Sequence, residues 1–73
     1  MKKNILKDYV WDRRCDGTYE VTYLLTGKFL IAIPKQDRKY CIEGSQETEI
    51  NAYGQEIPKR YNKFEVMEYL ANM

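Results

Sequence analysis

One apolar run constrains what this 73-residue chain can fold into. Phe29-Leu30-Ile31-Ala32-Ile33 has no polar break, and Pro34 ends it because proline has no N–H to donate to a strand ladder. A strand that is apolar on both faces must be covered on both faces. We expect a C-terminal helix to cover one face. The N-terminal segment, a folded-back sheet or a second copy of the protein must then cover the other.

The rest of the chain is divided by glycine and proline into short pieces, which favours a meander over βαβ units. Thr18–Leu25 alternates between apolar and polar residues, as is typical of a half-buried strand. The residues expected on its apolar face are Tyr19, Val21, Tyr23 and Leu25. The predicted strands are Tyr9–Cys15, Thr18–Leu25, Phe29–Ile33, Arg38–Glu43 and Glu47–Ala52.

The segment before Gly17 fits either a helix or a strand. Ile5, Leu6, Tyr9 and Val10 would form a helical stripe, whereas the aromatic and β-branched residues at 9–11 favour a strand. A three-residue hairpin loop at Asp16-Gly17-Thr18 supports the strand, because it would align apolar residues on one face. The opposed pairs in this register are Trp11 with Tyr23, Tyr9 with Leu25, and Arg14 with Glu20.

The C-terminal segment carries the clearest helix signal. Asn62 is a favoured N-cap residue, and Glu65 three positions later completes a capping box. Tyr61 and Val66 have the spacing of a hydrophobic staple. We expect a helix over Lys63–Asn72 that packs on the sheet, with a helix-in-groove recognition element as the functional alternative. Its apolar stripe would consist of Phe64, Met67, Leu70 and Ala71.

These elements predict a single domain over residues 1–73, of the α+β class, with a small antiparallel β-meander of four to five strands packed by one C-terminal α-helix. A core of this size rarely supplies more than about 3–5 kcal/mol of net stability. A partner subunit would add to that. The strand Phe29–Ile33, apolar on both faces, favours a homodimer in which a second copy covers one face.

The sequence offers little from which to build a catalytic or metal site. It has no histidine, so Ser-His and Cys-His nucleophiles are excluded, and its glycines are too far apart for a phosphate-binding loop. The carboxylate pairs Glu47/Glu49 and Glu65/Glu68 are more simply solvated surface. We therefore predict a protein that is not an enzyme and uses no cofactor or metal.

Cys15 and Cys41 are too few for a disulfide framework and stand too far apart in the sequence for a zinc site. We expect two reduced thiols, with a disulfide between them as the minor alternative. The apolar runs are shorter than a membrane span, and Met1-Lys2-Lys3-Asn4 is not followed by the apolar segment of a signal peptide. A cytoplasmic location without membrane attachment is the expectation.

Charge is distributed unevenly along the chain. Residues 1–40 hold nine Lys and Arg against five Asp and Glu, whereas residues 41–73 hold three against six. Alternate turns of a meander emerge at the same end of the sheet, so the first and third turns should form a basic end, while Glu43 and Glu47 lie at the other end opposed by Lys28. The predicted binding residues at the basic end are Arg13, Arg14, Lys35, Arg38, Lys39 and Tyr40.

Seven tyrosines against two phenylalanines add an interface-like composition. We predict a small protein-binding module that acts as a regulator, inhibitor or adaptor on a partner with an acidic surface, of the size typical of phage or mobile-element accessory proteins. The alternative is a nucleic-acid binder in which the basic residues contact phosphates and tyrosine or Trp11 stacks on bases. A sequence pI of about 7.7 is low for that alternative.

Overall fold

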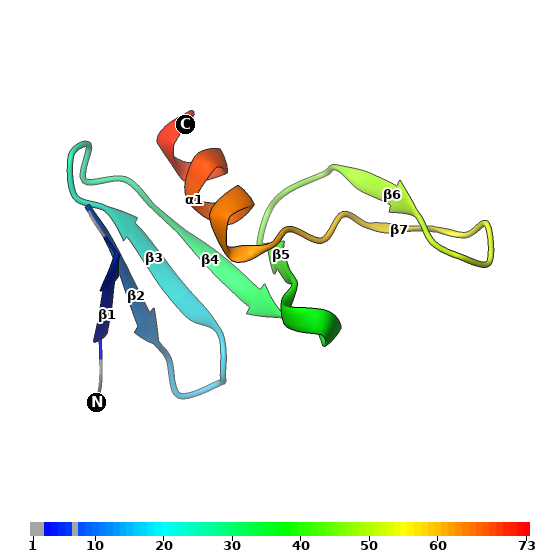
Figure 1. Cartoon of the computed structure of the whole chain (residues 1–73), viewed down its shortest axis with the longest axis horizontal. Coiled ribbons are helices and arrows are strands. Elements are labelled where there is room, and N and C mark those ends of the chain that lie inside the picture. Colours follow the sequence, from blue (N-terminus) through cyan, green and yellow to red (C-terminus); the bar gives the residue numbers. More distant parts are fainter. Residues whose placement is uncertain (1–2, 7) are drawn as a thin grey trace.

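A computed structural model describes the backbone of residues 3–6 and 8–73 and the side chains from residue 8 onward. Five strands form an antiparallel sheet in which each strand pairs with the next along the chain. They are β1 Lys3–Leu6, β2 Tyr9–Arg13, β3 Tyr19–Tyr23, β4 Phe29–Pro34 and β5 Tyr40–Ile42. Helix α1 (Lys63–Ala71) packs beside this sheet, and a hairpin of β6 (Thr48–Ile50) and β7 (Glu56–Pro58) projects away from it (Figure 1).

The predicted α+β class, antiparallel meander and C-terminal helix are confirmed. Three differences concern the strands. Two strands, Lys3–Leu6 and Glu56–Pro58, were not expected from the sequence. The predicted fifth strand lies outside the meander, in the separate hairpin. The predicted fourth strand begins at Tyr40 rather than Arg38, because Arg38 belongs to the 3-10 turn Gln36–Arg38.

The hairpin of β2 and β3 differs from the predicted register by two residues. Trp11 pairs with Val21, and Tyr9 pairs with Tyr23. The loop is Cys15-Asp16-Gly17, closed by the Arg14 N–H, which donates to the Thr18 carbonyl at 2.8 Å. Gly17 has a φ of 89°, so it takes the left-handed position that ends this loop type. A shift of two residues leaves each side chain on its predicted face.

The hydrophobic core lies between α1 and one face of the sheet. Its buried members are Trp11, Val21, Leu30, Ala32, Ile42, Tyr61, Val66, Met67 and Leu70. The predicted helix stripe is therefore correct for Met67 and Leu70 and wrong for Phe64, which is 75% exposed, and for Ala71. Tyr61 pairs with Tyr40 of β5, which fixes the entry into the helix and turns Val66 inward.

The capping box predicted for the helix is present. The Asn62 side chain accepts from the Glu65 N–H at 2.8 Å, and the Glu65 carboxylate accepts from the Asn62 N–H at 2.9 Å. Within the described residues, no helix combines the length and the apolar character needed to span a bilayer.

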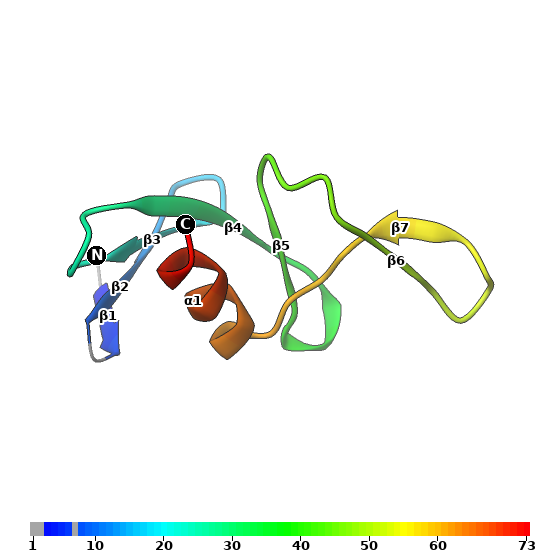
Figure 2. The ribbon, with the colours of Figure 1, turned by 90° about the horizontal axis from the view of Figure 1, so that it is seen from above.

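The sheet face opposite α1 carries the other side chains of the doubly apolar strand. Ile31 is buried, Ile33 is half-buried and Phe29 is 54% exposed on this face. Figure 2 shows α1 on one side of β3 and β4, with no helix or second sheet of the described residues on the other. The helix thus covers one face of the apolar strand, as predicted. The cover expected on the opposite face stays a prediction.

Candidate functional site

The turn between β2 and β3 and the turn between β4 and β5 lie at the same end of the sheet (Figure 1). Between them is an open hollow of about 400 Å³, which we call the basic hollow. The side chains that give it its chemistry are Arg13, Tyr19, Lys35, Arg38, Lys39 and Tyr40. Two antiparallel hairpin turns therefore bring together cations that are up to 26 positions apart in the sequence.

Five of the six predicted binding residues line this hollow: Arg13, Lys35, Arg38, Lys39 and Tyr40. Arg14 lines a neighbouring hollow with Asp12, Cys15 and Asp16 instead. The predicted gathering of basic turns is thus found in the structure, and their role in binding stays a prediction. At the other end, Glu47 pairs with Lys59 of the hairpin, while Lys28 Nζ donates to the Met73 carbonyl.

The cations of the basic hollow have no carboxylate partner at contact distance among the described residues. Lys59 and Arg60, by contrast, are paired with Glu47 at 3.7 Å and with Glu49 at 3.3 Å. An unpaired cation keeps its electrostatic attraction for an external anion, whereas a paired one must first lose its partner. The basic hollow is therefore available to a negatively charged ligand.

The turn that carries Arg38 has an unusual backbone. Asp37 and Arg38 are both in the left-handed region, with φ of 61° and 59°. For residues other than glycine this region costs roughly 1–2 kcal/mol each. The turn is closed by the Lys35 N–H, which donates to the Lys39 carbonyl at 2.8 Å. Strained backbone of this kind is typical of functional segments. The alternation of apolar and polar residues that predicts a strand does not reveal it.

The aromatic wall of the basic hollow is a packed cluster. Tyr19 and Tyr40 meet edge to face with ring centroids 6.1 Å apart, and both rings contact Trp11. Burial, followed by the proximity of Tyr19, raises the pKa of the Tyr40 hydroxyl above its usual value of 10.0, so this group stays neutral at physiological pH. Trp11 itself is only 2% exposed, so its ring faces are covered and do not offer the base stacking considered in the nucleic-acid alternative.

No family model, curated protein or solved structure matches this chain. Its site must therefore be judged on geometry alone. In the part of the chain that the structure describes, no three Cys, Asp or Glu side chains converge as a metal site would require. What the basic hollow offers is a set of positive charges without ion-pair partners beside two partly exposed phenol rings.

Proposed function

We propose that this chain is a non-enzymatic protein-binding module, a regulator, inhibitor or adaptor that holds an acidic surface of a partner protein in its basic hollow. The observation that carries the proposal is the gathering of Arg13, Lys35, Arg38 and Lys39, all without an ion-pair partner among the described residues, around one hollow. Arginine beside tyrosine is the composition of binding hot spots. A cytoplasmic location belongs to the same proposal.

A protein partner fits the aromatic wall better than a nucleic acid does. Base stacking requires exposed ring faces. Trp11 is buried, and Tyr19 and Tyr40 are engaged with it and with each other. Phosphate contact without stacking remains the alternative, in which affinity would fall steeply with salt.

Titration with two probes separates these functions. A glutamate-rich peptide and a mixed-sequence oligonucleotide would be titrated against the wild type and the Arg13→Glu/Arg38→Glu variant, with anisotropy as the readout. Lys28→Glu is the control, because it changes charge outside the hollow.

Peptide binding that is lost in the double variant and kept in the control supports the proposal. Tighter oligonucleotide binding with a steep salt slope supports the alternative, and no binding of either probe contradicts both. Capture from the native host followed by mass spectrometry would then identify the partner.

We also propose a homodimer, in which a second copy covers the sheet face opposite α1. The support is the apolar character of that face, on which Phe29 is 54% exposed and Ile33 is half-buried. Sedimentation at micromolar concentration tests this: Phe29→Lys should convert a dimer to a monomer, and a monomeric wild type would contradict the proposal.

A further inference from the structure

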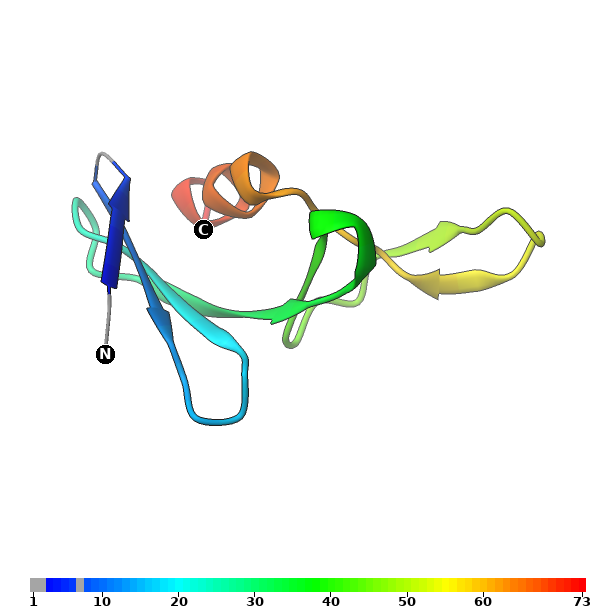
Figure 3. The same ribbon diagram turned by 60° about the horizontal axis from the view of Figure 1, so that its bottom comes forward.

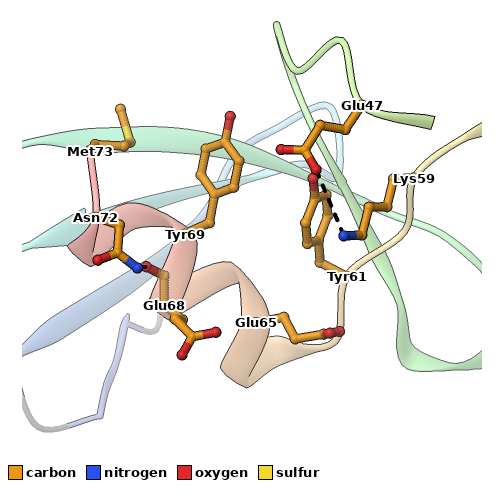
Figure 4. A pocket seen from close by; sticks show the side chains of 8 residues that line it. All are labelled: Glu47, Lys59, Tyr61, Glu65, Glu68, Tyr69, Asn72 and Met73. Atoms are coloured by element: carbon orange, nitrogen blue, oxygen red, sulfur yellow. Dashed lines mark hydrogen bonds and ion pairs between the residues drawn. The ribbon is translucent and has the colours of Figure 1, made fainter. Parts of the chain in front are cut away.

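A second hollow of about 450 Å³ lies between α1 and the base of the hairpin (Figure 4). Its chemistry differs from that of the basic hollow, because carboxylates and tyrosines dominate its walls. We call it the acidic-aromatic hollow and define it by Glu47, Lys59, Tyr61, Glu65, Glu68 and Tyr69. Its lining holds three carboxylates and one ammonium group, so the local charge favours cations.

The position of Lys59 shows what kind of group this hollow holds. Lys59 Nζ lies 5.2 Å from the centroid of the Tyr61 ring and 3.7 Å from Oε1 of Glu47. An ammonium group between an aromatic face and a carboxylate is the arrangement by which proteins recognise alkylammonium ligands. Lys59 is partly exposed, with 42% of its side chain accessible, so it can leave without disturbing the core.

Tyr61 provides a second, independent observation. Tyr61 is only 5% exposed, and its buried hydroxyl has no hydrogen-bond partner among the described residues. Figure 4 shows the ring pointing from the chain before α1 toward the end of the hollow where Glu47 lies. A buried hydroxyl without a partner destabilises the fold, and a donor from a ligand in the hollow would remove that penalty.

Tyr69 completes the wall. Its ring meets that of Tyr61 at 70°, with centroids 5.7 Å apart, and it is half-buried. The two rings therefore meet edge to face in the wall of the hollow. A metal ion does not fit this site, because no three carboxylates converge within the described residues.

We propose that the acidic-aromatic hollow is a second binding site that takes an alkylammonium group, with Lys59 as its internal competitor. This proposal does not rest on the function proposed for the basic hollow. The ligand group is that of a lysine side chain or of a free amine, and the test below distinguishes these two sources.

The probe is N-acetyl-lysine N-methylamide, followed by NMR on the Tyr61 and Tyr69 ring resonances. N-acetyl-norleucine N-methylamide is the matched control, since it has an apolar side chain of similar length and no charge. We expect saturable shifts with the lysine probe alone. Lys59→Met keeps the aliphatic stem and removes the competing ammonium, so affinity should rise roughly three- to fivefold. Glu47→Gln should lower it by a similar factor.

Equal shifts with both probes, or no gain in affinity in Lys59→Met, would overturn the proposal. Thermal unfolding of each variant shows that the fold is retained. Putrescine and a short lysine-bearing peptide separate the sources. Tighter binding of the peptide assigns a protein ligand, and tighter binding of putrescine assigns a free amine.

Discussion

Glu49 of β6 accepts two hydrogen bonds from Arg60. These bonds join the projecting hairpin to the segment that leads into α1. Its Oε2 accepts from the Arg60 N–H at 2.6 Å and from Arg60 Nε at 3.3 Å. An isolated two-stranded hairpin is marginally stable in water. Figure 3 shows the hairpin extending from the body of the molecule, so contacts at its base must fix its direction.

The stability of this attachment should depend on pH. Hydrogen bonds from the Arg60 backbone and side chain lower the pKa of Glu49 below its usual value of 4.5. Because the folded pKa lies below the unfolded one, the carboxylate stabilises the fold above pH 4.5, and this contribution is lost as the pH falls through the folded pKa. We expect Glu49→Gln to lower the melting temperature at pH 7, with the difference vanishing in acid.

Glu56→Gln is the control for that measurement. Glu56 accepts from the Thr48 hydroxyl at 2.8 Å in the same hairpin, and a glutamine oxygen can still accept that bond. Equal pH profiles for wild type and Glu49→Gln would contradict the attachment.

The two faces of α1 give a test of the packing. Leu70 is fully buried and Phe64 is 75% exposed. Leu70→Ala should cost about 2–5 kcal/mol of unfolding free energy, most of what a domain of this size has, whereas Phe64→Ala on the exposed face should cost less than about 0.5 kcal/mol. Urea unfolding followed by Trp11 fluorescence measures both. A larger loss of unfolding free energy for Phe64→Ala would indicate that Phe64 lies on the buried face of α1, as predicted from the sequence.

The sequence was most informative where local signals and burial agree. Asn62 and Glu65 predict the helix start because capping depends on residues three positions apart. Phe64 was misplaced because the rotation of α1 is set by the pairing of Tyr61 with Tyr40, a contact between distant segments. Glu56–Pro58 was missed because proline disfavours a central strand, although it is tolerated at a two-stranded edge.

The same distinction holds for the candidate sites. The basic hollow follows from the order of turns in a meander, which local patterns reveal. The acidic-aromatic hollow does not, since it joins Glu47 to the helix residues Glu68 and Tyr69 across the fold. Two tyrosines and a lysine at positions 59, 61 and 69 were visible signals, but only the structure shows Lys59 over the Tyr61 ring.

The two cysteines should differ in reactivity. Cys15 is an exposed free thiol in the β2–β3 loop, whereas Cys41 is buried in β5. An aromatic disulfide reagent at neutral pH should modify one thiol per chain rapidly and the second only at the rate of unfolding, because a buried sulfur is inaccessible to the reagent. Cys15→Ser should abolish the fast phase, and two fast phases in the wild type would contradict the burial of Cys41.

The strained turn at the basic hollow yields a prediction that couples stability to binding. Arg38 has a φ of 59°, which glycine adopts at no steric cost. Arg38→Gly should therefore raise the unfolding free energy by about 0.5–1 kcal/mol while weakening binding of the glutamate-rich peptide, since a cation is removed. Gln36→Gly in the same turn is the control: its φ is not in the left-handed region, so glycine should destabilise it and leave binding intact. A loss of stability in Arg38→Gly would contradict the left-handed backbone conformation at Arg38. If it kept full peptide affinity, Arg38 would have no part in the basic hollow.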